Sequence, residues 1–395
     1  MQKGSHKLRV PFPRGFSINY EIKKDISEKI YYLDKNIQKH TFDEEGCIVF
    51  YEGNNREKIF SEISNLVKDI FNSYRGVNLK ILFHNNILCE LAEDPTRFFF
   101  ETGQLFFSSP GTPILLKDLA KLSSSIDFFI EKVAKNLESR NFECPTTVPY
   151  ISLLKSGYLK SFPQHIMAVG SVHHNFDSLK SISELTPEND KVERFDPLIG
   201  EHNQILSPTV CAHCFEILKN SQIIEENLIY TAKSKCSRHE GKNYNSLARL
   251  QTYTMREIIF FGSALYVKNM QENLLDFFKE TFKDWELNFR VIVATDPFFT
   301  AGNEKLRIFQ SSLNLKYELQ LFIPHDESWL AIASFNHHRD SLVNPYDISY
   351  KNNNAKLNSG CFGLGFERLI YGLYCQKGKD IHKWPMRILK DLLLK

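Results

Sequence analysis

A glycine-rich segment near the end of the chain limits the possible folds more than any other feature of the sequence. Residues 360–369 read Gly-Cys-Phe-Gly-Leu-Gly-Phe-Glu-Arg-Leu, and apolar residues continue to Leu373. Glycines let a ligand approach the backbone of a strand, so this pattern predicts a strand that turns into a helix beside a ligand. Glu367 and Arg368 fall at the start of that helix. There Arg368 can reach a γ-phosphate or cover an adenine, and Glu367 can hold Mg²⁺.

Two further segments carry residues suited to a nucleotide. Residues 236–240 predict a strand end on which Arg238 can hold the α-phosphate of ATP. Glu240, two residues later, shares that face and can accept a hydrogen bond from an adenine amino group. Tyr253, on the next predicted strand, can stack on a base. Each residue alone also has an ordinary interpretation, as a surface salt bridge for the Arg–Glu pair and a core position for the tyrosine.

Cys211, Glu257 and Cys361 together offer a metal site. Two thiolates and a carboxylate suit Zn²⁺ with one coordination position left open. Their spacing gives no local support, because the three residues lie far apart in the chain and buried free cysteines are common. The 8 cysteines show no regular disulfide spacing, which is typical of reduced thiols in a cytoplasm.

Charge and hydropathy narrow the class of function. The net charge of +2 over 395 residues is smaller than the basic excess usual in proteins that bind a nucleic-acid backbone. A local basic patch is still compatible with this net charge. The first fifteen residues lack an apolar core, so we expect no signal peptide. Runs of about 18 apolar residues are absent, so we expect no membrane span and a cytoplasmic location.

The order of strand and helix patterns predicts an α+β fold. Residues 1–104 read as a small α+β domain of unknown role, with strands near 47–51 and 77–83 and a helix near 59–70. In residues 105–395 we expect a catalytic domain. Its predicted strands lie at 236–240, 253–261, 290–294, 317–323 and 330–335, and its helices at 126–137 and 267–282. The order lacks βαβ regularity, which favours a mostly antiparallel sheet flanked by helices.

These segments together resemble the class II aminoacyl-tRNA synthetases, whose second motif carries R-x-E and whose third is glycine-rich and ends in Glu-Arg. Over about residues 105–395 the chain is most similar to the amino acid:[carrier protein] ligases. Those enzymes are relatives of the atypical, zinc-dependent seryl-tRNA synthetase catalytic core. Further matching segments are 156–164, 206–211, 236–240 with Arg249 and 253–257, 294–299, and 334–340.

The resemblance implies an ATP-dependent, AMP-forming ligase with a class II-like fold. It implies activation of a small amino acid as aminoacyl-adenylate, then transfer to the phosphopantetheine thiol of a carrier protein. It also implies a homodimer formed through the helix near 124–138, and no tRNA partner. The implied zinc ligands are Cys211, Glu257 and Cys361, and the open position takes the substrate amino group. The implied ATP and Mg²⁺ residues are Arg238, Glu240, Tyr253, Gly365, Glu367 and Arg368, and those for the amino acid are Asn336 and Asp340.

Some residues depart from the family pattern, and two other functions stay open. Ser237 stands where an aromatic residue is usual, and His337, Arg339 and residues 341–344 differ in the segment that contacts the amino acid. One alternative is a tRNA-charging seryl-tRNA synthetase-like enzyme whose N-terminal domain binds tRNA; the lysines of that domain are interleaved with acids. The other is a non-catalytic paralogue, which the intact nucleotide and metal residues disfavour.

Overall fold

A large sheet forms the centre of the protein. The computed structural model describes residues 6–13, 20–74, 80–89, 93–185, 200, 203–240, 244, 246–295, 310, 313–351 and 355–394. The sheet has eight strands in the order β4-β14-β15-β16-β18-β13-β12-β7. They are β4 (Lys80–Asn85), β7 (Arg140–Asn141), β12 (Leu228–Ser237), β13 (Thr252–Gly262), β14 (Phe289–Val293), β15 (Lys316–Ile323), β16 (Ser328–Arg339) and β18 (Asn358–Gly365). Neighbours are antiparallel except β7 and β12, which confirms the expected α+β architecture.

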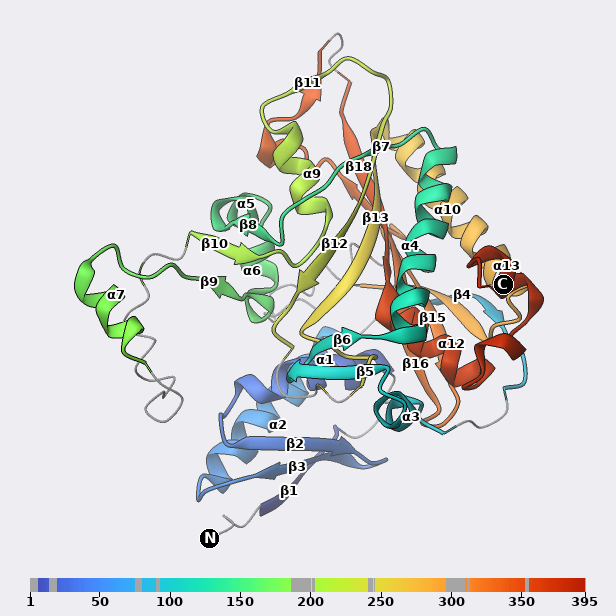
Figure 1. Cartoon of the computed structure of the whole chain (residues 1–395). Helices are drawn as coiled ribbons and strands as arrows, with labels where there is room; N and C mark the ends of the chain where they lie inside the picture. Colours follow the sequence, from blue (N-terminus) through green and yellow to red (C-terminus); the bar gives the residue numbers. More distant parts are fainter. Residues whose placement is uncertain are drawn as a thin grey trace.

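Three helices cover one face of this sheet: α4 (Lys117–Asn136), α10 (Ala264–Asp284) and α12 (Phe366–Lys377) (Figure 1). The α10 helix begins where the Ser263 hydroxyl accepts from the Tyr266 N–H at 3.2 Å. Its buried Phe278 stacks on Phe362 of β18 with ring centroids 4.3 Å apart. In α12, a Cβ on Gly372 would lie 2.4 Å from Leu321, so the glycine lets this helix lie close on β15. The hydrophobic core therefore lies between the sheet and these helices.

The N-terminal unit has its own sheet and core. Strands β1 (His6–Pro11), β3 (Gly46–Tyr51) and β2 (Ile37–Phe42) pair in that order. They pack with α1 (Tyr20–Lys29), the 3₁₀ turn η1 (Ile30–Tyr32) and α2 (Arg56–Ser73) around a separate apolar cluster. The predicted strand at 47–51 and the helix at 59–70 are confirmed.

The strand expected at 77–83 was predicted in the N-terminal domain, but it belongs to the large sheet. Residues 77–79 lie outside the described residues, and β4 is an edge strand of the large sheet, paired with β14. Phe83 contacts Phe289 with ring centroids 5.5 Å apart, and Phe99 and Leu105 join the main core. The division at residue 104 stays a prediction, and this packing favours a boundary nearer residue 80.

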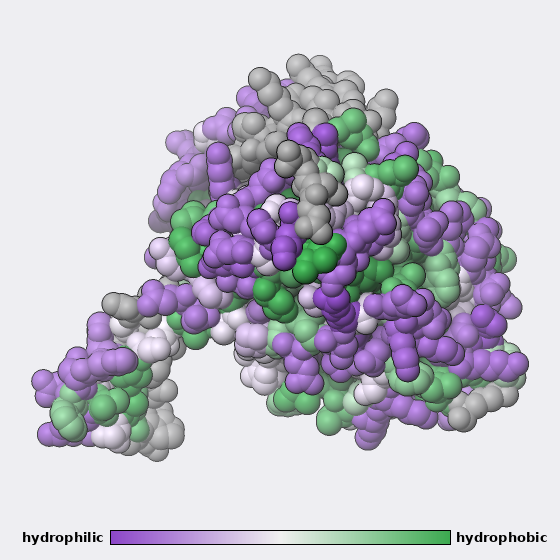
Figure 2. Space-filling view, turned by 90° about the horizontal axis from the view of Figure 1, so that it is seen from above, coloured by the Kyte–Doolittle hydropathy of each residue, from purple (hydrophilic) through white to green (hydrophobic). Residues whose placement is uncertain are grey.

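Smaller elements complete the fold on both sides of the sheet and at its ends. They are α3 (Thr96–Glu101), β5 (Leu105–Ser109), β6 (Thr112–Leu115), β8 (Thr147–Pro149), α5 (Tyr150–Lys155), α6 (Tyr158–Ser161), η2 (Pro163–His165), β9 (Ala168–Val169), α7 (Phe176–Ser183), β10 (Gln204–Leu206), α9 (Cys211–Leu218), β11 (Gln222–Ile223), η5 (Asn344–Tyr346), β17 (Ser349–Tyr350), η6 (Ile381–Lys383) and α13 (Met386–Asp391). The α7 arm stands apart from the rest, with Phe176 90% exposed (Figures 1 and 2). Within the described ranges, every helix is too short or too polar to span a bilayer.

Candidate functional site

A cavity of about 610 Å³ lies on the face of the sheet away from the core helices. Alternate residues of a strand point to opposite faces. On β13, Ile258 and Phe260 point into the core, whereas Glu257 and Met255 line the cavity. On β18 the same alternation turns Cys361 toward the cavity. The strand pattern alone therefore places a carboxylate and a thiol on one surface.

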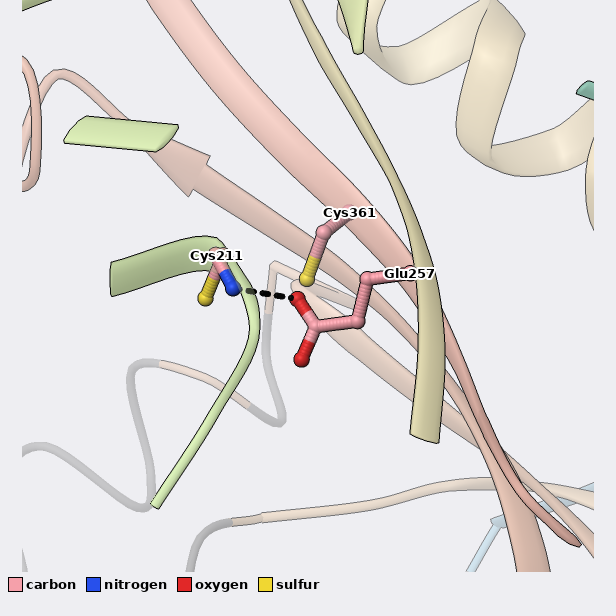
Figure 3. A group of neighbouring side chains, drawn as sticks. All are labelled: Cys211, Glu257 and Cys361. Atoms are coloured by element: carbon pink, nitrogen blue, oxygen red, sulfur yellow. Dashed lines mark hydrogen bonds between the residues drawn. The ribbon is translucent and has the colours of Figure 1, made fainter. Parts of the chain in front are cut away.

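Cys211, Glu257 and Cys361, which all line this cavity, converge on one another (Figure 3). Their ligand atoms all lie within 4.8 Å of one another. Cys211 is the first residue of α9, and the Glu257 carboxylate accepts from the backbone N–H groups of Val210 at 3.1 Å and Cys211 at 3.0 Å. These bonds hold the start of the helix against β13.

The register of the sheet explains how the two strands present their ligands together. Cys361 pairs with Ile259, and Gly363 pairs with Glu257, so the thiol and the carboxylate are diagonal neighbours. A Cβ on Gly363 would lie 2.9 Å from Met255 and 3.3 Å from the Glu257 side chain. The glycine therefore keeps open the space that the carboxylate occupies.

The three side chains form a cluster of acidic groups in which Glu257 and Cys361 are buried and Cys211 is partly buried. Burial first, and then the charge of Cys361, raises the pKa of Glu257 to about 8. A hydrogen bond with Cys361 and burial raise the pKa of the Cys211 thiol, while the same bond lowers the pKa of Cys361. A bound cation would instead favour the ionised forms of these groups.

The donor set fits Zn²⁺. Two sulfurs and one carboxylate are a usual zinc set, and tetrahedral ligation at about 2.0–2.3 Å needs only small side-chain movements from the observed separations. Cys361 also has outer partners, because the Asn336 amide nitrogen and the His338 Nε2 lie 3.4 Å and 3.5 Å from its sulfur. Cys214, one turn along α9, is fully buried and lies outside this trio of ligand atoms.

Two arginines also line the cavity. The Arg238 Nε donates to the Pro208 carbonyl at 3.0 Å, and its guanidinium lies 5.6 Å from the ring centroid of Tyr253. Arg368 donates to the carbonyls of Ala248 at 2.9 Å and Ala331 at 3.2 Å. Backbone carbonyls fix these guanidinium groups without cancelling their charge, so both can attract an anion.

Glu240 lies beside the arginines and forms a salt bridge with Arg249 at 3.1 Å. Burial works to raise the pKa of Glu240, but Arg249 and Arg368 outweigh it and hold the pKa below its usual value. The carboxylate is therefore charged and can accept hydrogen bonds. The strand predicted over 236–240 ends earlier, because β12 stops at Ser237 and the chain then leaves the sheet.

Glu367 is 1% exposed, and its carboxylate is engaged on both oxygens. It accepts from the Thr254 N–H at 2.8 Å and the Thr254 hydroxyl at 2.7 Å, and the Lys235 ammonium lies 3.4 Å away. These contacts tie the start of α12 to β13. The expected Mg²⁺ role of Glu367 stays a prediction, and a metal there would have to share these oxygens. Sequence reasoning gave no role to Thr254, although it lies in the matching segment 253–257, and none to Lys235, which lies outside the matching segments.

The remaining predicted residues also line the cavity. Asn336 donates to Ser334 at 3.1 Å as well as facing Cys361, and Asp340 follows the end of β16. Gly365 is the last residue of β18, and a Cβ there would meet only the Ile332 carbonyl, at 3.9 Å. In the matched segment 294–299, residues 296–299 lie outside the described residues.

Comparison with known proteins gives one consistent picture. The class II tRNA synthetase core domain (G, H, P, S and T) matches residues 191–376. Amino acid–[acyl-carrier-protein] ligase 2 of Bradyrhizobium diazoefficiens is 27% identical over 291 residues, which cover 73% of this chain and 85% of that protein. Ligase 1 of the same organism is 28% identical over 256 residues, covering 63% of this chain and 74% of that protein.

The chain is also similar to serine–tRNA ligases. The type-2 enzyme of Methanopyrus kandleri is 25% identical over 290 residues, which cover 67% of this chain and 53% of that protein. Among solved structures, M. kandleri SerRS, in complex with A. aeolicus tRNASec, aligns with a TM-score of 0.70 at 18% identity. The alignment covers 98% of this chain and 77% of that chain, and it establishes the fold.

Proposed function

We propose that this chain, which has the core domain of the class II tRNA synthetases and is similar to amino acid–[acyl-carrier-protein] ligases, activates an amino acid with ATP. The product of the first step is an aminoacyl-adenylate, with pyrophosphate as the leaving group. In the second step the aminoacyl group passes to the phosphopantetheine thiol of a carrier protein, and AMP leaves.

The observation that carries this proposal is the combination of two sites in one cavity. The first is formed by Cys211, Glu257 and Cys361, a donor set suited to zinc with a position left open. The second is formed by Arg238 and Arg368, whose charges suit a triphosphate. When bound, Zn²⁺ would take the amino group of the amino acid and so fix where its carboxylate lies.

The side chains of the cavity suit the remaining tasks of the first step. Arg238 and Arg368 would hold the phosphates and stabilise charge as the amino acid carboxylate attacks the α-phosphorus. Glu240 and Tyr253 would contact the adenine, and Gly365 would leave room beside it. Mg²⁺ would neutralise the triphosphate, with Glu367 as its proposed protein ligand.

The amino acid would lie between the metal trio and β16, where Asn336 and Asp340 line the wall. We propose a small amino acid, as implied by the family, although His337 and Arg339 depart from the family pattern beside it. A panel of amino acids in the exchange of pyrophosphate into ATP identifies the substrate directly.

Two acceptors are compatible with this first step. A carrier protein is favoured because alignment with the ligase covers 85% of that relative, whereas alignment with the serine–tRNA ligase covers 53%. One observation favours tRNA as the acceptor. The structural alignment with M. kandleri SerRS covers 98% of this chain and so includes the N-terminal unit. We further propose a cytoplasmic homodimer formed through α4, where Phe128 is 52% exposed.

The acceptor is tested by supplying the enzyme with a radiolabelled amino acid and either holo carrier protein or total tRNA. Carrier protein that lacks the phosphopantetheine arm is the matched control. We expect label on the holo carrier alone, as a thioester that hydroxylamine removes. Label on tRNA and none on the carrier would show that the chain is a tRNA-charging synthetase and not a carrier-protein ligase.

A further inference from the structure

The N-terminal unit reaches the cavity of the catalytic domain. Figure 1 shows this unit at the end of the large sheet where β12 stops and β13 begins. Glu28, near the end of α1, is one of the residues that line the cavity. Tyr32, the last residue of η1, touches the catalytic domain directly. The unit therefore abuts the segment that carries Arg238 and Glu240.

Through its hydroxyl, Tyr32 joins η2 to the segment that follows β12. Its oxygen lies 2.8 Å from the Gln164 carbonyl, 2.7 Å from Nδ1 of His239 and 3.0 Å from the His239 carbonyl. A phenol has one proton to donate, so the arrangement satisfies most partners when His239 donates through Nδ1 and Tyr32 donates to a carbonyl. The two rings also meet edge to face, with centroids 5.6 Å apart.

His239 is the residue between Arg238 and Glu240. Because β12 ends at Ser237, the ladder of the sheet does not hold this tripeptide along its length. Separate bonds hold it instead: the Arg238 N–H donates to the Gln251 carbonyl at 2.9 Å, and the His239 N–H donates to the His165 carbonyl at 3.1 Å. The Tyr32 hydroxyl fixes the opposite side of His239, at its ring and its carbonyl.

We propose that Tyr32 is a positioning residue for the nucleotide site, which fixes His239 and thereby directs Arg238 and Glu240 into the cavity. The inference rests on the proposed function, because it assumes that these two residues bind ATP. It gives the N-terminal unit a role that its own sequence does not suggest. Tyr32 does not contact the reacting atoms, and it is 37% exposed, so its effect is moderate in size.

Tyr32→Phe tests this inference, because it removes the hydroxyl and keeps the ring contact. Loss of one or two hydrogen bonds of ordinary strength predicts ATP binding about 3- to 30-fold weaker. The KM for the amino acid and the zinc content should stay at wild-type values. The matched control is Tyr31→Phe, which removes a hydroxyl bonded at 2.8 Å to His40 inside the N-terminal unit. It should change ATP binding less than about twofold.

ATP affinity is measured on the full chain by calorimetry, and KM values by amino acid-dependent exchange of pyrophosphate. Tyr32→Phe that binds ATP as tightly as wild type overturns the inference. So does an equal loss for ATP and amino acid, or an equal effect of Tyr31→Phe, since either would mean a purely structural role. His239→Ala removes the imidazole partner of the Tyr32 hydroxyl. In the double variant, the loss of ATP-binding free energy should be smaller than the sum of the losses in His239→Ala and Tyr32→Phe. A loss equal to that sum contradicts the inference.

The same measurements separate this inference from the proposed function. A wild-type chain that fails to bind ATP overturns the proposed function, and the inference with it. A wild-type chain that binds ATP and exchanges pyrophosphate, but is indifferent to the Tyr32 hydroxyl, overturns the inference alone.

Discussion

Zinc binding at pH 7 should release about two protons from this protein, one from Cys211 and most of one from Glu257. The pKa of Glu257 is raised to about 8 by burial and by the charge of Cys361. Such a carboxyl is about nine-tenths protonated at pH 7 and about one-tenth protonated at pH 9. A hydrogen bond with Cys361 and burial raise the pKa of the Cys211 thiol well above its usual value, whereas the same hydrogen bond lowers the pKa of Cys361.

The release should therefore fall from about two protons at pH 7 to about one at pH 9. Protons compete with the metal for both groups, so zinc affinity weakens as the pH is lowered. Near pH 7, zinc affinity falls about 100-fold for each unit by which the pH is lowered. The assay is calorimetric titration of the metal-free protein with zinc, held by a weak chelator, in buffers of different ionisation enthalpy.

Cys214→Ala is the control for this count, since Cys214 lies beside the trio without belonging to it. This variant should release the same number of protons as wild type at each pH. A release of about one proton at both pH 7 and pH 9 would mean that Glu257 is ionised before the metal arrives. That result would refute the account of the buried acidic cluster.

Three substitutions test other parts of the site. Cys361→Ala should remove the bound zinc and abolish adenylate formation while Cys214→Ala retains both, as measured by metal content per chain and by pyrophosphate exchange; normal zinc in Cys361→Ala would exclude it as a ligand. Arg238→Ala should slow adenylate formation about 100- to 1,000-fold with an unchanged circular dichroism spectrum, because charge at the α-phosphate loses a fixed cation; a loss below tenfold would contradict this role. Thr254→Val should destabilise the fold by about 1–3 kcal/mol in urea unfolding, because buried Glu367 loses a donor, and Thr254→Ser should restore most of the loss; an unchanged midpoint would show that this bond is dispensable.

The sequence predicted most regular elements of the catalytic domain, because hydrophobic periodicity is a local signal. The strand expected at 253–261 is β13, Thr252–Gly262, and the helix expected at 267–282 is α10, Ala264–Asp284. The residues at which strands end were less predictable. The β12 strand stops at Ser237 although the next three residues read as strand, because pairing with β13 decides where a strand ends and pairing is not local.

Contacts between distant segments explain what the sequence could not predict. Glu257 and Cys361 become neighbours only through the register of β13 with β18, so the trio came from resemblance and not from spacing. The pattern of β4 predicted a strand without saying which sheet it joins. Tyr32 lies 207 residues before His239, and its surroundings in the sequence carry no sign of that contact.

Amino acid-dependent exchange of pyrophosphate into ATP tests the central claim most directly, when a panel of amino acids is offered to zinc-loaded and to chelator-treated protein. We predict exchange with a narrow set of small amino acids, its loss on removal of zinc, and its return when zinc is added back. Zinc-loaded protein that exchanges with none of the panel, or undiminished exchange by the metal-free protein, would contradict the account.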